Sequence, residues 1–202
     1  MDIRFTFINR SHDQRRLPVF LCHADAGDRG AAGAVAWKVI RNCAYDWRHP
    51  FVYAWQMEAG LADSFGNYSP RLAASCGQVF AALPTVAGRV FRRHSGSCSG
   101  IAIVNKLAQG AVHACLFNEG RLLACHTNLA PGQTANFRIP AVLRIGAAPN
   151  VQQGQLLDAE AMANVGCEIP LLGLASADIV MTGGGGGQAP PLSFHIENIV
   201  KS

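Results

Sequence analysis

Large apolar and aromatic side chains alternate with smaller or polar ones along residues 51–57, and this period of two constrains the fold more than any other feature of the sequence. Phe51, Tyr53, Trp55 and Met57 fall on one face of an extended strand. Aromatic side chains at that spacing bury large areas against a second layer. The pattern therefore predicts that residues 51–57 form an inner wall of a β-sandwich.

Short apolar runs separated by turn residues recur along the rest of the chain, as expected for strands. The other predicted strands are 3–9, 17–22, 34–40, 78–83, 88–92, 101–105, 111–117, 122–128, 133–139, 141–146, 169–174, 177–181 and 192–200. Residues 155–164 are the one stretch of good helix formers, and Gly166 follows it in the place of a C-cap. Roughly a dozen short strands with at most one short helix predict an all-β fold, an antiparallel β-sandwich.

Length and composition favour a single β-sandwich domain over residues 1–202. Half of the residues are apolar and only 15% are charged, so the chain should bury much of itself, either in its own core or in an oligomer. The formal net charge is +4, but the basic residues are scattered except at Arg15-Arg16 and at residues 92–94. Nucleic-acid binding, which needs a clustered basic patch, is therefore not expected.

The first residues lead directly into a predicted strand and lack the basic and apolar regions of a signal peptide. No apolar run approaches the roughly 18 residues of a membrane-spanning helix. We therefore expect a cytoplasmic protein without a membrane span, whose seven cysteines are reduced thiols.

A run of five glycines, residues 183–187, separates the last two predicted strands. A phosphate-binding loop would need a Lys and a Ser or Thr at fixed spacing after the glycines, followed by a helix start, and none is present. We interpret the run as the tip of a hairpin.

The clearest hairpin joins residues 111–117 to residues 122–128, and it carries four side chains of metal-ligand type: His113, Cys115, Cys125 and His126. A two-residue turn places His113 opposite His126, and a three-residue loop places it opposite Cys125. Zinc usually takes three or four ligands. We favour structural cysteines and expect no cofactor, and keep His113, Cys125 and His126 as the candidate ligands of a metal-binding alternative.

Catalytic patterns are weak throughout the sequence. Cys22 and His23 are neighbours on a predicted strand and so point to opposite faces, which prevents His23 from activating the thiol. The carboxylates show no paired arrangement, and the serines of residues 95–100 lack the context of a nucleophile elbow. We expect a protein that is not an enzyme, and we assign no catalytic residue.

Further aromatic residues lie just before the alternating strand. Trp37, like Tyr53 and Trp55, is expected in the core. Tyr45, Trp47 and His49 lie in the connection that precedes the strand, where they could stack on a sugar ring, a flat apolar ligand or a neighbouring subunit. These three residues are the predicted ligand- or partner-binding site.

The order of these motifs resembles that of the rhizosphere-expressed RhiA-type proteins and their uncharacterised bacterial relatives. The resemblance spans mainly residues 3–61 and rests on the following segments: Phe7-Ile8-Asn9-Arg10-Ser11, Val19-Phe20-Leu21, Ala36-Trp37, Phe51-Val52-Tyr53-Ala54-Trp55 and Gly60-Leu61. This chain has Asn9-Arg10 where those proteins carry two asparagines, and Val52-Tyr53-Ala54-Trp55 where they carry Phe-Val-Trp. The resemblance implies a cytoplasmic, non-catalytic, all-β protein whose biochemical role is undefined.

Low charge, high apolar content and many strand edges that must be paired or covered favour a protein that works by association, either as a homo-oligomer or with a protein partner. One alternative is a module that binds a carbohydrate or a small apolar ligand through Tyr45, Trp47 and His49. The other alternative is the metal-binding protein described above.

Overall fold

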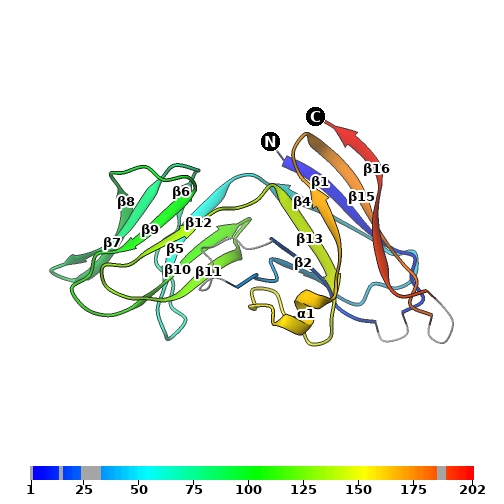
Figure 1. The fold of residues 1–202 in the computed structure, drawn as a ribbon, viewed down its shortest axis with the longest axis horizontal. Helices are drawn as coiled ribbons and strands as arrows, with labels where there is room; N and C mark the ends of the chain where they lie inside the picture. The colour runs from blue at the N-terminus through cyan, green and yellow to red at the C-terminus, as the bar shows by residue number, and fades with distance from the viewer. Residues whose placement is uncertain (1, 14–15, 24–32, 186–189) are drawn as a thin grey trace. The chain divides into compact units, whose positions relative to one another are not determined.

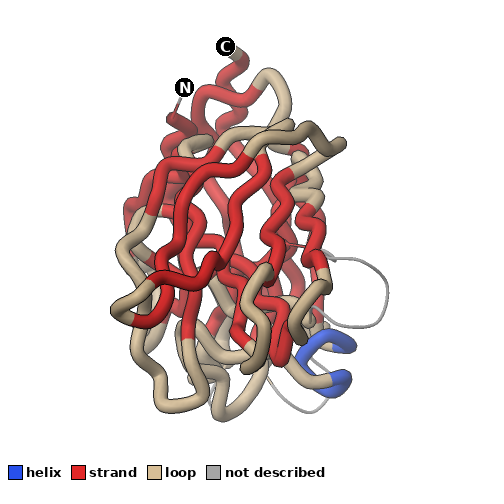
Figure 2. The backbone as a smooth tube through the Cα atoms, turned by 90° about the vertical axis from the view of Figure 1, so that its left-hand side faces the viewer, coloured by secondary structure: helices blue, strands red, loops and turns tan. Residues whose placement is uncertain are grey.

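The computed structural model describes residues 2–13, 16–23, 33–185 and 190–202 (Figure 1). Strands dominate this part of the chain, as Figure 2 shows, and the fold is an all-β sandwich as predicted. The helix is α1 (Ala159–Ala163), and the strands are β1 (Asp2–Asn9), β2 (Val19–His23), β3 (Lys38–Ile40), β4 (Arg48–Ala54), β5 (Met57–Ala62), β6 (Leu72–Ala74), β7 (Val79–Thr85), β8 (Gly88–His94), β9 (Ile101–Asn105), β10 (Val112–Asn118), β11 (Arg121–Leu129), β12 (Thr134–Phe137), β13 (Val142–Ala147), β14 (Val165–Pro170), β15 (Leu174–Thr182) and β16 (Ser193–Lys201). Arg15 and the last two glycines of the run at 183–187 lie outside the described residues.

The residues group into two compact units. Unit 1 contains Met1–Ala24, Ala36–Trp55 and Ala141–Ser202, and unit 2 contains Asp25–Val35 and Gln56–Pro140. This division describes how the residues group by contacts, and the single domain expected over residues 1–202 stays a prediction. Within the described residues, no helix is both long and apolar enough to cross a membrane.

Unit 1 holds two four-stranded sheets, with strand orders β16-β15-β1-β4 and β14-β13-β2-β3. The β1–β15 pair is parallel and the other pairs are antiparallel. Aromatic rings fill the core between the sheets: Trp37 packs edge-on against Phe51 and Tyr53, and Phe5 stacks on Phe51. Trp37 and Tyr53 are fully buried, which confirms their predicted core positions.

Unit 2 also holds two four-stranded sheets, with orders β11-β10-β5-β6 and β12-β9-β7-β8. The β7–β9 pair is parallel, and the remaining pairs are antiparallel. Phe80, Leu61, Ile103 and Phe137 are among its fully buried side chains.

The alternating segment at 51–57 is divided between two strands, contrary to the prediction of a single one. β4 ends at Ala54 and β5 begins at Met57, and the chain passes from unit 1 to unit 2 between Trp55 and Gln56. Phe51, Tyr53 and Met57 are buried as expected, but Trp55 at the break is only half-buried. A break of two residues leaves the period-two alternation in phase, so the alternation carries no sign of the break.

The predicted helix is shorter than expected and its C-cap is a different residue. α1 begins after Asp158, whose carboxylate accepts a hydrogen bond from the Ala161 amide at 2.8 Å, and it is capped at its C-terminus by Asn164. Gly166 lies in β14 instead, where a Cβ would come within 2.8 Å of Cδ2 of Phe194. The strand predicted at 169–174 accordingly begins earlier, at Val165.

Candidate functional site

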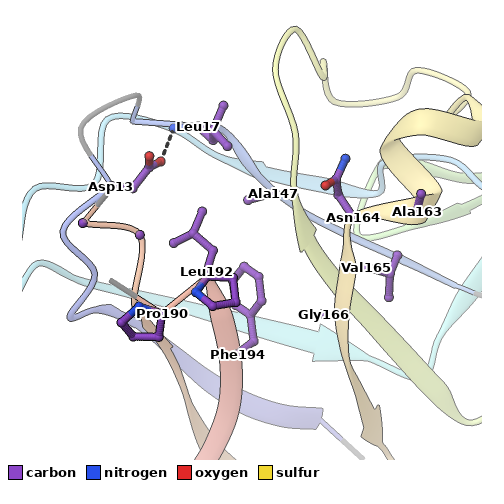
Figure 3. A pocket seen from close by; sticks show the side chains of 13 residues that line it. Asp13, Leu17, Ala147, Ala163, Asn164, Val165, Gly166, Pro190, Leu192 and Phe194 are labelled. Carbon is purple, nitrogen blue, oxygen red and sulfur yellow. Dashed lines mark hydrogen bonds between the residues drawn. The ribbon is translucent and has the colours of Figure 1, made fainter. Parts of the chain in front are cut away.

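A cleft of about 570 Å³ opens in unit 1 beside the tip of the β15–β16 hairpin (Figure 3). Its walls come from the segment between β1 and β2, the end of β13, the start of β14 with the end of α1, and the start of β16. The lining residues are Asp13, Leu17, Ala147, Ala163, Asn164, Val165, Gly166, Gly184, Gly185, Pro190, Pro191, Leu192 and Phe194.

Glycines and backbone hydrogen bonds position the hairpin wall. Gly183 and Gly184 both have positive φ, and a Cβ at Gly183 would collide with the carbonyl oxygen of Pro191. The His12 amide donates to the Gly183 carbonyl at 2.8 Å, and the Gly184 amide donates to Pro190 at 2.9 Å. The start of the glycine run is therefore a specific backbone junction of the hairpin, in agreement with its predicted place at a hairpin tip.

Buried polar side chains position the opposite end of the cleft. Asn9 and Ser11 are buried, and Oδ1 of Asn9 accepts from both the amide and the hydroxyl of Ser11, at 2.9 and 2.7 Å. Asp13 follows, and its Oδ2 accepts from the Leu17 amide at 2.8 Å. This local network sets the course of the backbone at the end of β1 and brings the carboxylate of Asp13 to the cleft.

The third wall depends on close packing around two glycines. A Cβ at Gly146 would lie 2.6 Å from the Asn164 carbonyl oxygen and 2.7 Å from Cζ of Phe20. Asn164 itself donates from Nδ2 to the Glu160 carbonyl at 2.8 Å. Figure 3 shows the Asn164 side chain on the wall across the cleft from Asp13, with Leu192 between them. The cleft thus combines an apolar floor of Leu192 and Phe194 with the carboxylate of Asp13 and the amide of Asn164.

The predicted aromatic site is only partly assembled. Tyr45 and Trp47 are 62% and 56% exposed on a turn in which the Trp47 amide donates to the Ala44 carbonyl at 3.1 Å. Two backbone hydrogen bonds connect this turn to Asn9. The Asp46 amide donates to the Asn9 carbonyl, and the Asn9 amide donates to the Trp47 carbonyl. His49 lies apart from them, half-buried on β4 opposite Phe7.

Tyr45 has an aromatic neighbour that the sequence did not indicate. The ring of His12 stacks on it, with centroids 5.3 Å apart and planes 13° from parallel. Both residues line an open hollow of about 490 Å³ together with Asn9, Ser11, Asp13, Arg16, Cys43 and Ala44. Because His12 covers one face of the Tyr45 ring, the exposure of Tyr45 must come mainly from the opposite face and the edge.

The hairpin of β10 and β11 has the register predicted for a two-residue turn next to the turn, and it departs from both predicted registers farther along the strands. Glu119 and Gly120 form a two-residue turn with positive φ at both positions, and Asn118 pairs with Arg121 as that turn requires. An irregularity between Leu116 and Phe117 then shifts the pairing by one residue.

The shift changes which side chains meet across the hairpin. His126 pairs with Ala114, and Cys125 pairs with Cys115, so His113 faces neither predicted partner. Nδ1 of His113 accepts instead from the Asn128 amide at 3.0 Å. Throughout the described residues, no group of three or more His, Cys, Asp or Glu side chains could hold a metal ion.

The two thiols of Cys115 and Cys125 lie 3.4 Å apart in a small apolar cluster with Ala62 and Phe117. Their shared hydrogen bond raises the pKa of Cys115 and lowers the pKa of Cys125. The thiol of Cys22 differs from this pair, because its burial raises its pKa to about 11. A thiol with so high a pKa is a poor nucleophile near neutral pH.

Asp13, Asn164 and the apolar residues of the cleft were not singled out by sequence reasoning. The available signals were the polar segment after the first strand and the glycine run, and neither indicates that the two segments meet.

Comparison with models of protein families, with curated proteins and with solved structures finds no match to this chain. The resemblance to RhiA-type proteins stays a prediction.

Proposed function

We propose that this protein binds a small, mainly apolar molecule that carries a hydrogen-bond donor or a cationic group, in the cleft of unit 1. The observation that carries the proposal is the composition of the cleft, which has aliphatic and aromatic walls and one carboxylate, that of Asp13, among the lining residues that the structure describes. Its volume of about 570 Å³ lies within the range of roughly 300–1,000 Å³ that is usual for small-molecule sites.

The polar groups suggest the chemistry of the ligand. Asp13 offers a carboxylate, which accepts hydrogen bonds. Asn164 donates one of its two side-chain N–H groups to the Glu160 carbonyl, and its side-chain oxygen is a second acceptor. A ligand with an apolar body over Leu192 and Phe194 and an ammonium group toward Asp13 would satisfy this arrangement.

Calorimetric titration tests the proposal with straight-chain primary amines of about six to ten carbons and with the alcohols of the same lengths. We expect amines to bind more tightly than alcohols, and Asp13→Asn to weaken amine binding about tenfold while leaving alcohol binding unchanged. Leu192→Gln should weaken both series. Leu172→Gln is the matched control, because Leu172 is 78% exposed on a turn of the same unit and does not line the cleft. Equal effects of the two leucine substitutions would contradict the proposal.

A second candidate is self-association through the turn that carries Tyr45 and Trp47. The turn is held by backbone hydrogen bonds to Asn9, so little ordering free energy would be lost when its exposed rings are buried in an interface. Light scattering after size exclusion, over a range of concentrations, should show a mass that increases with concentration. Tyr45→Ser with Trp47→Ser should abolish the increase, and Phe65→Ser, at a more exposed ring in unit 2, should not. A constant monomer mass for the native chain would exclude this candidate.

A further inference from the structure

Cys115 and Cys125 lie directly opposite each other on neighbouring antiparallel strands of unit 2. Their sulfur atoms are 3.4 Å apart and share a hydrogen bond. All seven cysteines of the chain are free thiols in the structure. We propose that Cys115 and Cys125 form a redox-active dithiol that low-molecular-weight disulfides oxidise to a cross-strand disulfide.

The backbone geometry suits this bond. Directly opposed residues of an antiparallel pair have Cα atoms about 4.5–5.5 Å apart, which lies within the range of about 4.4–6.8 Å found in disulfides. The sulfur atoms must approach from 3.4 Å to about 2.05 Å, a movement that small side-chain rotations supply. β11 is the last strand in the order of its sheet, and on its other side it makes only an isolated bridge between Ala124 and Ala34 among the described residues.

The surroundings of the pair favour attack by one particular thiol. Cys125 is 8% exposed and Cys115 only 1%, so an external disulfide reaches Cys125 first. The ring of Tyr68 packs edge-on against Phe117 of the same cluster, with centroids 5.6 Å apart. The guanidinium of Arg71 lies 4.0 Å over the Phe117 ring of the same cluster. Its positive charge opposes the rise in the pKa of Cys115, so it assists the later deprotonation of that second thiol.

The exchange takes place in two balanced steps. The thiolate of Cys125 attacks one sulfur of the external disulfide, forming a mixed disulfide and releasing one small thiolate, which takes a proton. The thiol of Cys115 then loses its proton and attacks Sγ of Cys125, which releases the second small thiol. The two protein thiols lose two electrons in total, and the external disulfide is reduced to two thiols.

Peptide mapping of the full chain tests the proposal. The reduced protein is equilibrated with glutathione disulfide, alkylated and digested with trypsin, which cuts after Lys106, Arg121 and Arg138. Residues 107–121 and 122–138 then form two peptides, each with one of the two cysteines. We expect the disulfide-linked pair to increase at least about tenfold over a sample kept in dithiothreitol.

The other cysteines provide the internal comparison. Cys76 is exposed, so it should acquire glutathione under the same conditions and thereby report that the oxidant is active. The proposal would be overturned if Cys76 is glutathionylated in a sample in which Cys115 and Cys125 are recovered as alkylated thiols or as stable glutathione adducts.

Two serine variants test the order of attack. Cys115→Ser should trap glutathione on Cys125, because the resolving thiol is absent. Cys125→Ser should leave Cys115 unmodified. If Cys115 in the Cys125→Ser variant acquires glutathione as fast as Cys125 does in the Cys115→Ser variant, the assigned order of attack is wrong. Circular dichroism of both variants checks that they are folded.

Discussion

The hydroxyl of Tyr53 lies 3.0 Å from Nε2 of His23, and both residues are buried. Tyr53 belongs to β4 and His23 to β2, which lie in different sheets of unit 1. The bond is thus a directional polar link within a core that consists mainly of aromatic and aliphatic side chains. Its position gives a structural role to His23, which the sequence had suggested only as the neighbour of Cys22.

Removing the hydroxyl should destabilise unit 1. In Tyr53→Phe the buried imidazole loses this partner without gaining water, so we expect the free energy of unfolding to fall by about 1–3 kcal/mol. Urea denaturation followed by intrinsic fluorescence measures the change. Tyr45→Phe is the control, because the Tyr45 ring is largely exposed, and its stability should be unchanged. Equal stability of Tyr53→Phe and the native protein would contradict the prediction.

Trp37 and Trp47 should differ strongly in their contribution to stability. Trp37 is fully buried against Phe51 and Tyr53, so Trp37→Ala should cost about 3–5 kcal/mol or prevent folding. Trp47 is more than half exposed, so Trp47→Ala should change the free energy of unfolding by no more than about 0.5 kcal/mol. Thermal and urea denaturation of both variants measure the two losses of stability. Equal losses in the two variants would contradict the burial of Trp37 and the exposure of Trp47.

Much of the strand content could be predicted from period and turn residues alone. The strand predicted at 101–105 has the observed bounds of β9, and the hairpin of β10 and β11 was predicted, with its two-residue turn as one of two alternatives. β5 was missed as a separate strand because residues 59–70 are rich in turn residues, and the three-residue strand β6 was also missed. The two parallel pairs were missed as well, since each joins strands that are not consecutive in the sequence.

The side-chain pairing of the hairpin shows why the candidate sites were harder to predict than the strands. One irregularity in the register between Leu116 and Phe117 replaces the predicted partners of His113 by other residues and brings Cys115 to Cys125. Such an irregularity depends on packing around the strand and leaves no pattern in the sequence. The cleft is similar, because Asp13 and Leu192 meet only when the sheets of unit 1 are assembled.

The buried thiol of Cys22 should make stability fall at alkaline pH. Burial raises its pKa from 9.0 to about 11, and the nearby Arg144 opposes this shift. Between these two pH values the unfolded chain releases the proton while the folded chain retains it. The stabilisation is therefore complete below about pH 9 and is lost as the pH rises through 11, with a total of about 2–3 kcal/mol.

Urea denaturation between pH 8 and pH 11 measures this effect as a difference between the native protein and Cys22→Ala. The other cysteines and the tyrosines titrate in both proteins, so their contributions cancel. We expect Cys22→Ala to lose less stability than the native protein over this interval. Parallel pH profiles of the two proteins would show that Cys22 does not titrate as described.

The pKa of His49 should respond to the charge of Lys38. Burial is the main cause that lowers the pKa of His49 below 6.5, and the Lys38 ammonium is the second. Lys38→Met should therefore raise the pKa of His49 while leaving it below 6.5, as measured by NMR titration of the imidazole protons. Because the folded-state pKa is depressed, the contribution of His49 to stability is complete above 6.5 and is lost as the pH falls through the folded-state pKa. Arg48→Met, at an exposed position on the same strand, should leave the pKa of His49 unchanged, and an equal shift there would argue against a specific effect of Lys38.

The close approach of Gly166 to Phe194 should appear as an energetic coupling between the two positions. A Cβ on residue 166 would come within 2.8 Å of Cδ2 and 3.4 Å of Cε2 of the Phe194 ring, so the ring would have to shift to accommodate it. Gly166→Ala should therefore cost about 1–3 kcal/mol by overpacking. In a Phe194→Leu background the smaller side chain leaves space for the new methyl group, and the cost of Gly166→Ala should decrease by at least about 1 kcal/mol. Urea denaturation of the native protein, the two single variants and the double variant gives this coupling, and additive free energies would show that the glycine is not required by the ring.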